Sequence, residues 1–550
     1  MAPLGFLMES AVLGESHDRA MIDGAAHPRT GPLWRFRDTV SGPDAPWKSD
    51  PMVKRAAGAL LLSIVIDHDS ARPVSIQLYA ALRDLILSGG FAVGERLPAS
   101  RTLARELGLS RTTVMDAFDR LTAEGMIESR IGSGAYVSRA LEAERPRAPR
   151  APGDAAAPQA PARLSRAMER AVSGFAERRR LPSSARAFTT ALPAFEDFPM
   201  SQWARLTAKH WRGARHEVMG YGEPLGYPAL RRSIALHLRA NRGIACDAEQ
   251  IFIVGGAQQA FHLIGLTLLD PGDKVWFENP GAIGARNSLV AAGAELVPVP
   301  VDERGLCVAE GLRLAPRFRL AFVTPSHQQP LGTVMSLERR FALLHAAARA
   351  GAWIVEDDYD GEFSFGGPPL PTLKSVDTTG LVIYVGTFSK SLFPSLRLGY
   401  VLAPPALVEP LGTIMTRLLN GVPTSTQAVV SEFIDEGHFA VHLRRMRRIY
   451  AERHEALCHA ARARLAGALD VVPSHSGLHT IGWLRGGWPE RRVVAAAADR
   501  GITVSPIERF AIAPIDERGL VLGFGGVTPA QIDAGVCVLA EVLERQPRVA

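Results

Sequence analysis

The sequence predicts an α/β protein in two unequal parts: a small helix-turn-helix unit with a β-hairpin, and a large domain with a mostly parallel sheet. Helical periodicities and a hairpin pattern fill residues 71–138. From about Ser165 onward, strand and helix patterns alternate, as is typical of a doubly wound sheet. A stretch rich in Pro, Ala and Arg separates the two patterns. At 550 residues, the chain has room for this division.

Composition describes an ordinary globular chain, with 47% hydrophobic and 21% charged residues. The net charge of +6 permits an acidic partner such as nucleic acid but does not require one. No apolar run reaches the roughly 18 residues of a membrane span, so we expect a soluble cytoplasmic protein without a membrane partner. The cysteines lie far apart without a CxxC pair, so neither a metal site nor a disulfide framework is indicated. They are Cys246, Cys307, Cys458 and Cys537.

Residues 1–70 are expected to form an N-terminal extension that is partly disordered. The first 51 mix Gly, Pro, Trp and charges without a helix or strand period. They are either disordered or an over-long translation start, because Met52 begins a stretch that runs into the first predicted helix. That helix covers residues 74–88 and ends at Gly89-Gly90. Its apolar face comprises Val74, Leu78, Ala81, Leu82, Leu85 and Ile86.

A helix-turn-helix pattern follows in LPASRTLARELGLSRTTVMDAFDRLTAEGMIESRIGSGAYV, residues 97–137. Gly108 supplies the turn after a short helix, and Ser110 is a good N-cap for a second one. The first turn of the second helix exposes Arg111, Thr112 and Thr113, where a recognition helix carries base and phosphate contacts. Its buried face comprises Val114, Ala117, Phe118 and Leu121. MIESR, the IGSG turn and AYV then form a hairpin, although a small helical bundle unrelated to DNA has similar helix spacing.

This stretch resembles the GntR family of winged-helix regulators, whose LPxSRxLAxxLGxSRxTVxxAxxxLxxEG pattern it matches almost position by position. The resemblance implies a winged helix-turn-helix DNA-binding domain over residues 71–138 and a double-stranded DNA operator as partner. The hairpin is then the wing, whose tip approaches the minor groove. The implied DNA-binding residues are Arg101, Arg111, Thr113, Arg130 and Gly132.

Residues 139–185 are predicted to be a linker, with the sequence ERPRAPRAPGDAAAPQAPAR in its Pro/Ala/Arg-rich part. Such a segment buries too little surface to fold and stays semi-extended, so the first domain is free to reorient. Its arginines either attract phosphates without sequence preference or belong to a solvated spacer.

The large domain is expected to span residues 186–545, with a ligand crevice at the C-terminal ends of its strands. A helix is predicted to open at Gly256. The predicted strands are Ile251–Val254, Val275–Phe277, Glu295–Val299, Leu320–Val323, Trp353–Val355, Leu381–Val385 and Leu398–Val401.

Lys390 is the centre of the stretch LVIYVGTFSKSLFPSLRLGY, which reads as a strand, a turn of small polar residues and a second strand. The chain has only six lysines, and only an amine forms a Schiff base or changes protonation near neutral pH. Thr387 and Arg397 flank this amine with a hydroxyl and a guanidinium, which suits an aldehyde cofactor that carries a phosphate. Taken alone, Lys390 is equally well a surface lysine.

Three more polar clusters follow predicted strands. GGAQQAF, residues 255–261, opens a helix and offers either a phosphate site or a structural turn. In EDDYDGEF, residues 356–363, Asp357 is placed to hold a protonated heterocyclic nitrogen and Tyr359 to donate to a ring hydroxyl. A solvated acidic loop is the alternative there. SHQQPLG, residues 326–332, is the third cluster.

Together these clusters resemble the fold type I aminotransferases of class I and II, which bind pyridoxal 5'-phosphate. The resemblance implies a large, mostly parallel sheet domain and a small C-terminal α+β domain. It makes Lys390 the Schiff-base lysine, Asp357 the partner of the pyridine nitrogen and Tyr359 the partner of the ring hydroxyl. Tyr221 resembles a tyrosine that reaches the phosphate of a neighbouring subunit, which implies a homodimer. The implied phosphate-holding residues are Thr387, Arg397, Gly256, Ala257 and Gln258.

The order of winged helix, linker and aminotransferase-like domain resembles the MocR subfamily of GntR regulators. The resemblance implies a head-to-tail homodimer and a large domain that senses pyridoxal phosphate itself, or an amine or amino acid compound, through the cofactor. We therefore expect a transcription regulator and not an enzyme.

Two departures from the family pattern bear on this expectation. Ala282 stands where an aromatic residue usually stacks on the cofactor ring, at a loss of about 0.5–1.5 kcal/mol. Val521 stands where aminotransferases place an arginine for the substrate carboxylate. An active aminotransferase with an accessory DNA-binding module is one alternative, which Val521 disfavours. A scaffold that has lost its cofactor is the other, supported only by Ala282.

Overall fold

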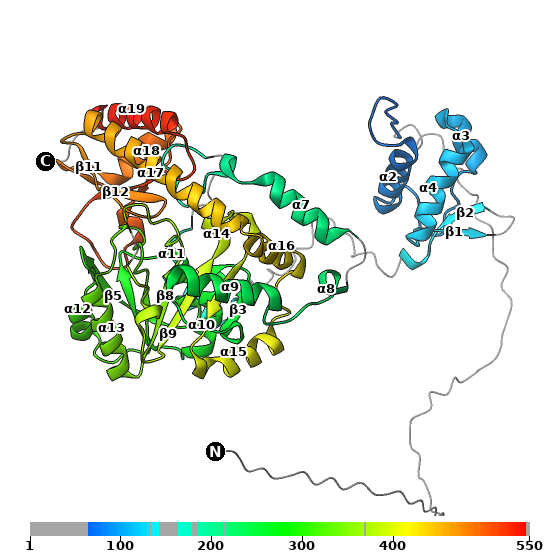
Figure 1. Cartoon of the computed structure of the whole chain (residues 1–550). Coiled ribbons are helices and arrows are strands. Elements are labelled where there is room, and N and C mark those ends of the chain that lie inside the picture. Colours follow the sequence, from blue (N-terminus) through cyan, green and yellow to red (C-terminus); the bar gives the residue numbers. More distant parts are fainter. Residues whose placement is uncertain are drawn as a thin grey trace, which may run out of the picture. The chain divides into compact units, whose positions relative to one another are not determined.

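The computed structural model describes residues 64–130, 134–141, 163–178, 185–212, 216–367 and 370–545. It contains two compact units, one within residues 1–160 and one within residues 161–550 (Figure 1). No helix of the described residues is long and apolar enough to cross a membrane.

The N-terminal unit is a winged helix, as predicted. Three helices pack on an antiparallel hairpin around a core that includes Leu78, Leu82, Val114 and Leu121. The elements are α2 (Val74–Leu87), α3 (Ser100–Leu107), α4 (Arg111–Ala123), β1 (Ile127–Arg130) and β2 (Gly134–Val137). The backbone of Gly108 is left-handed, at φ 66°, and so ends α3. The Ser110 side chain accepts a hydrogen bond from the Thr113 N–H and begins α4.

The second unit is built on an eight-stranded sheet in the order β3-β10-β9-β8-β7-β4-β5-β6. The strands β9, β8, β7, β4 and β5 run parallel, whereas β10 is antiparallel to both of its neighbours and β6 is antiparallel to β5. The mostly parallel sheet predicted from the sequence is therefore confirmed. The strands are β3 (Ile251–Val254), β4 (Lys274–Asn279), β5 (Glu295–Asp302), β6 (Gly305–Leu306), β7 (Leu320–Val323), β8 (Trp353–Asp358), β9 (Val382–Thr387) and β10 (Gly399–Leu402).

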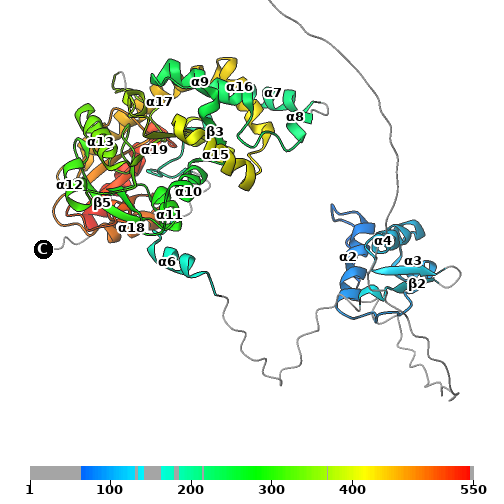
Figure 2. The same cartoon turned by 90° about the horizontal axis from the view of Figure 1, so that it is seen from below.

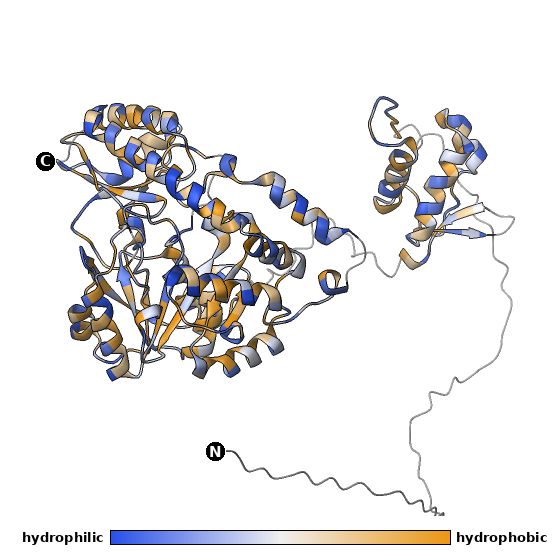
Figure 3. Ribbon diagram, in the orientation of Figure 1, coloured by the Kyte–Doolittle hydropathy of each residue, from blue (hydrophilic) through white to orange (hydrophobic). Residues whose placement is uncertain are grey.

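Helices cover both faces of this sheet. One face packs on α10 (Ala257–Leu268), α11 (Ile283–Ala291) and α15 (Pro405–Leu418). The other packs on α12 (Val308–Leu314) and α13 (Leu337–Ala350), and near β3 on α9 (Pro228–Arg242) and α16 (Thr424–Asp435). The strands are hydrophobic almost throughout because they are buried from both sides, whereas the helices carry polar outer faces (Figure 3).

A small C-terminal part follows the long helix α17 (His438–Arg464). Its antiparallel sheet has the order β11-β12-β14-β13, and α18 and α19 pack with α17 against it. These elements are β11 (Leu469–Val471), β12 (His479–Leu484), α18 (Glu490–Asp499), β13 (Ser505–Pro506), β14 (Gly519–Gly523) and α19 (Pro529–Arg545). Other helices of the described residues are α6 (Arg166–Gly174), α7 (Met200–Trp211), α8 (His216–Met219) and α14 (Phe388–Ser391). Short 3-10 turns cover Phe195–Asp197, Ala248–Gln250, Lys374–Val376, Pro394–Leu396 and Ile507–Phe510.

Candidate cofactor and DNA-binding sites

One cavity lies where the parallel strands end, and it brings together eight of the nine residues predicted to bind the cofactor. These are Lys390, Asp357, Tyr359, Thr387, Arg397, Gly256, Ala257 and Gln258. Tyr221 does not line it: its side chain is 94% exposed on the surface of the single chain. That exposure leaves it available to a second subunit.

Lys390 lies on a short helix, α14, where the sequence predicted only a turn of small polar residues. The Thr387 side chain accepts a hydrogen bond from the Ser389 N–H and so caps this helix, which the strand–turn pattern did not reveal. The Lys390 Nζ donates a hydrogen bond to the Ala191 carbonyl at 3.0 Å. Burial lowers the pKa of Lys390 to about 8, although the carboxylates of Asp360 and Asp357 oppose this effect. About a tenth of this amine is therefore neutral and nucleophilic at pH 7, far more than for an ordinary lysine.

Asp357 lies near the end of β8 and is only 5% exposed. Its Oδ1 atom is buried without a hydrogen-bond partner among the residues that the structure describes. Burial, reinforced by the nearby carboxylates of Asp358 and Asp360, raises the pKa of Asp357 well above its ordinary value. A protonated ring nitrogen placed beside Oδ1 would supply the missing donor and stabilise the carboxylate form.

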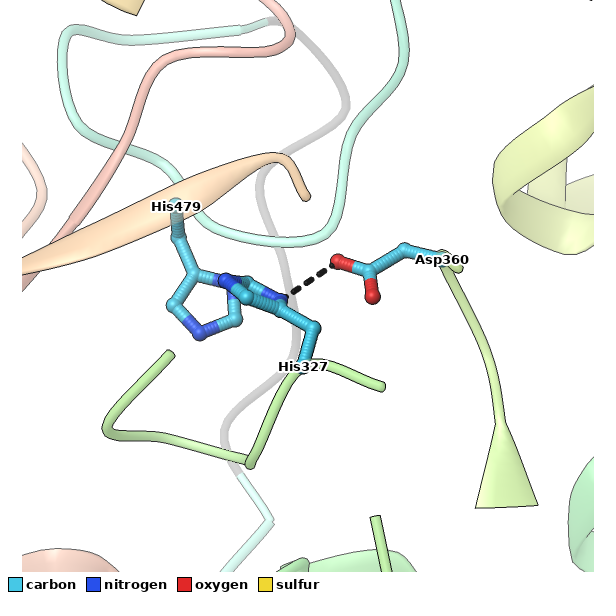
Figure 4. A group of neighbouring side chains, drawn as sticks. All are labelled: His327, Asp360 and His479. Carbon is cyan, nitrogen blue, oxygen red and sulfur yellow. Dashed lines mark hydrogen bonds and ion pairs between the residues drawn. The ribbon is translucent and has the colours of Figure 1, made fainter. Parts of the chain in front are cut away.

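A buried polar network surrounds Tyr359. The Nδ1 atom of His327 lies 3.1 Å from the Tyr359 hydroxyl and 2.9 Å from Asp360 Oδ2. The rings of His327 and His479 pack with centroids 4.7 Å apart, and Figure 4 shows both beside Asp360. His479 hydrogen-bonds to the Pro330 carbonyl at 3.1 Å, and burial lowers its pKa to about 3, so its ring is neutral. The network holds the Tyr359 hydroxyl at the cavity wall.

The other end of the cavity is the start of α10. Gly256 precedes this helix with φ 92°, a backbone conformation that only glycine adopts readily, and the first N–H groups of the helix are left for an anion. Arg397 has φ 50°, and this strained backbone places an exposed guanidinium at the cavity rim. Arg178 also lines the cavity and donates a hydrogen bond to Gln258 Oε1.

These residues fit pyridoxal phosphate. Lys390 provides the amine, Asp357 an unpartnered acceptor for the ring nitrogen, Tyr359 a hydroxyl for the ring oxygen, and the α10 start with Arg397 the phosphate site. When bound, the cofactor supplies an aldehyde that links to an amine and a ring that withdraws electrons from it. The chain's own groups would orient this ring, and burial makes the neutral, reactive form of Lys390 more accessible than in an ordinary lysine.

The wall at β14 is apolar. Val521, which lines the cavity, is 1% exposed and packs with Ile283, Ile481 and Phe510. Ala282 lines the cavity as well and offers no ring to stack on a cofactor. The structure thus places both departures from the aminotransferase pattern at the cavity itself.

Several cavity residues were not predicted from the sequence. Asp360, and His327 behind the cavity wall, belong to the EDDYDGEF and SHQQPLG clusters, so the signal was present although no role was assigned to either residue. His479 and Arg178 belong to no such motif, because they reach the cavity only through the packing of distant segments.

The predicted DNA-binding residues lie on the N-terminal unit. Arg101 on α3 and Arg111 on α4 are exposed. Thr113 is instead half-buried, and its hydroxyl lies 2.8 Å from Ser110 Oγ, so it stabilises the start of the helix. Arg130 ends β1 with its guanidinium 4.6 Å from the centre of the Tyr136 ring. Gly132, at the predicted wing tip, lies outside the described residues.

The fold and the site define a class of protein: a winged helix fused to an aminotransferase-like domain. Two family models match accordingly, bacterial regulatory proteins of the gntR family over residues 75–137 and aminotransferase class I and II over residues 188–538. The chain belongs to the MocR subfamily of GntR-type transcriptional regulators. The probable rhizopine catabolism regulatory protein MocR of Rhizobium meliloti is 40% identical over 86% of this chain and 94% of its own length.

Other relatives agree with this assignment. The pyridoxine biosynthesis transcriptional regulator PdxR of Corynebacterium glutamicum is 29% identical over 84% of this chain and 94% of its own. Among solved structures, the kynurenine aminotransferase of Pyrococcus horikoshii matches with a TM-score of 0.62 and 26% identity, covering 67% of this chain and 92% of its own. The α-aminoadipate aminotransferase LysN of Thermus thermophilus matches with a TM-score of 0.61 and 27% identity, over 69% and 94%.

Proposed function

We propose that this transcriptional regulator binds pyridoxal phosphate through Lys390 and senses either the cofactor itself or an amine that reacts with it. The observation that carries the proposal is the buried Oδ1 of Asp357, which has no partner among the described residues and lies in the same cavity as a lysine of lowered pKa. An acceptor left unpaired at this depth costs stability unless a ligand supplies the donor.

A sensing role is favoured over transamination by the apolar wall at Val521. An enzyme that turns over ordinary α-amino acids needs a cation there for the substrate carboxylate, and a buried valine offers none. The chain therefore keeps the groups that hold the cofactor and lacks one that would bind an amino acid productively.

The mechanism is a shift between arrangements of a head-to-tail homodimer, in which Tyr221 of each subunit reaches the phosphate held by the other. Cofactor, alone or with an amine, binds one arrangement better and so changes the spacing of the two winged helices on DNA. Arg101, Arg111 and Arg130, with the wing tip at Gly132, contact the operator.

Cofactor binding is tested by the visible spectrum of the purified protein with added pyridoxal phosphate. The wild type should show an absorbance band that borohydride removes, and Lys390→Ala should not. A wild type without such a band would refute the cofactor proposal.

Sensing is tested with a DNA fragment selected from random sequence for binding to the full-length protein. We expect its affinity or footprint to change when pyridoxal phosphate, alone or with an amine, is added. Arg111→Ala should abolish tight binding, whereas Arg83→Ala, on α2 and paired with Glu124, should not. DNA binding that is indifferent to the cofactor and to every amine tried would refute sensing while leaving cofactor binding intact.

A further inference from the structure

Residues 163–178, which we call the entry strap, belong to the predicted linker of residues 139–185, but in the structure they pack on the large domain. Within the strap, α6 packs beside α11 (Figure 2). The Asn287 side chain of α11 clamps Ala176, accepting from its N–H at 2.8 Å and donating to its carbonyl at 2.9 Å. The Glu177 carbonyl accepts a hydrogen bond from Arg509 at 3.1 Å. The strap therefore runs from the linker side of the chain to the cofactor cavity.

Arg178, at the end of the strap, lines the cavity together with Lys390. Its guanidinium donates to the Oε1 atom of Gln258, in the first turn of α10, where the phosphate site is proposed. Gln258 is confined there, because a Cβ added to Gly284 would lie 2.2 Å from its Nε2 atom. Arg178 is thus held at the phosphate end of the cavity by a residue with little freedom to move.

A neutral amide oxygen is a weak partner for a guanidinium, which pairs most strongly with a phosphate through two parallel hydrogen bonds. Arg397 is another cation on this cavity, but it projects from the turn that follows α14 and does not belong to the strap.

We infer, resting on the proposed function, that Arg178 binds the phosphate of pyridoxal phosphate and so makes the attachment of the entry strap depend on cofactor occupancy. With the cofactor bound, the strap is held by the phosphate in addition to its α11 contacts. Without the cofactor, only the protein contacts hold it. Because the strap is the C-terminal part of the predicted linker, occupancy of the cavity reaches the chain that leads to the DNA-binding unit.

The test compares pyridoxal phosphate with pyridoxal, which lacks the phosphate, in absorbance titrations of the full-length protein. Arg178→Ala should raise the Kd for pyridoxal phosphate by about 10- to 100-fold, since a charge-assisted contact is lost. It should change the Kd for pyridoxal by no more than about twofold. Arg170→Ala, on the exposed side of α6, is the matched control and should change neither.

Hydrogen exchange of the strap supplies a second readout. In the wild type, pyridoxal phosphate should slow exchange over residues 166–178 and pyridoxal should not. This difference should vanish in Arg178→Ala and persist in Arg170→Ala.

Two outcomes would overturn the inference. If Arg178→Ala weakens both ligands equally, or neither, the inference fails and the proposed function stands. If the wild type binds no pyridoxal phosphate at all, both fail.

Discussion

Strand β8 carries three consecutive buried carboxylates that differ in their hydrogen-bond and ion-pair partners. Glu356 accepts hydrogen bonds from the Leu373 and Lys374 N–H groups at 2.9 and 2.7 Å. Asp358 forms an ion pair with Arg242 in which both side chains are at most 3% exposed. Asp357, between them, faces the cavity with one oxygen that finds no donor among the described residues.

The difference follows from the alternation of side chains along a strand. Glu356 and Asp358 point to the face where the surrounding protein provides backbone N–H groups, a guanidinium and the Tyr384 hydroxyl, which donates to Asp358 at 2.5 Å. Asp357 points the other way, into the cavity. Asp358 Oδ1 also has no donor among the described residues, but the other oxygen of Asp358 is held by Arg242 and Tyr384. Asp357 lines the cofactor cavity and has no such ion pair among the described residues, so it is the carboxylate placed to meet a ligand.

The largest effect should come from removing the cation that pairs with Asp358. Arg242→Met leaves a buried carboxylate without its partner, which typically costs about 3–5 kcal/mol. The midpoint of urea unfolding of the large domain, followed by fluorescence, measures this loss. Arg239→Met, on the same helix but with an exposed ion pair, should cost less than about 1 kcal/mol. Equal losses in the two variants would mean that Asp358 does not depend on Arg242.

The next effect concerns the pH dependence of stability. Burial raises the pKa of Glu356 to about 7 from an ordinary 4.5. A raised pKa contributes stability that is present below the unfolded pKa and lost as pH rises through the folded one. Between pH 5 and pH 8 the wild type should therefore lose about 2–3 kcal/mol through this group. Glu356→Gln, which cannot ionise, should not show that loss.

Urea unfolding at both pH values measures the difference. Burial also raises the pKa of Glu278 to about 7, but that part of the pH dependence is common to wild type and variant and cancels. Glu338→Gln, at an exposed position on α13, should lose as much stability between pH 5 and pH 8 as the wild type does. If Glu356→Gln loses as much stability between pH 5 and pH 8 as the wild type does, Glu356 has an ordinary pKa in the folded state.

Replacing Asp357 should have the opposite effect to removing the ion-pair partner of Asp358. The affinity for the cofactor should fall, and the stability of the protein should not. Asp357→Asn replaces a buried carboxyl group that has no ion-pair partner among the described residues, so the stability of the cofactor-free protein should stay within about 1 kcal/mol of the wild type. Its affinity for pyridoxal phosphate should fall at least about tenfold, or roughly 1.4 kcal/mol, because the ring nitrogen loses its carboxylate partner.

Absorbance titration measures this affinity, with Glu356→Gln as the control. Glu356 lies next to Asp357 in the chain but does not line the cavity, so its replacement should leave the affinity unchanged. If Asp357→Asn instead destabilises the protein as much as Arg242→Met does, the contrast between the carboxylates is wrong.

The sequence predicted those parts of the site that depend on residues close together in the chain. Lys390, Asp357 and Gly256 each follow a strand whose apolar run is visible in the sequence, so their place at one edge of the sheet could be derived. The short helix that carries Lys390 was missed because a single turn leaves no periodicity and depends on the Thr387 cap.

The partners that set the properties of these residues are distant in sequence. The hydrogen bond from Arg178 to Gln258 spans 80 positions, and that from His479 to the Pro330 carbonyl spans 149. Such contacts depend on how the small C-terminal part and the entry strap pack on the large sheet, which no local pattern records. Likewise, nothing in EDDYDGEF distinguishes Asp358, the ion-pair carboxylate, from Asp360, the cavity carboxylate.

Asp360 offers the finest test, because it acts on Lys390 through its charge. Of the groups that raise the pKa of Lys390 against the effect of burial, the Asp360 carboxylate is the strongest. Only the neutral amine captures pyridoxal phosphate, so the wild-type capture rate should rise with pH and level off above about pH 8. Asp360→Asn should move this midpoint downward by up to about one pH unit.

Stopped-flow absorbance between pH 6 and pH 10 measures the midpoint, and Glu278→Gln should leave it in place. An unchanged midpoint, or an upward shift, in Asp360→Asn would mean that the Asp360 charge does not raise the pKa of the lysine, and that the network in Figure 4 serves only to hold Tyr359.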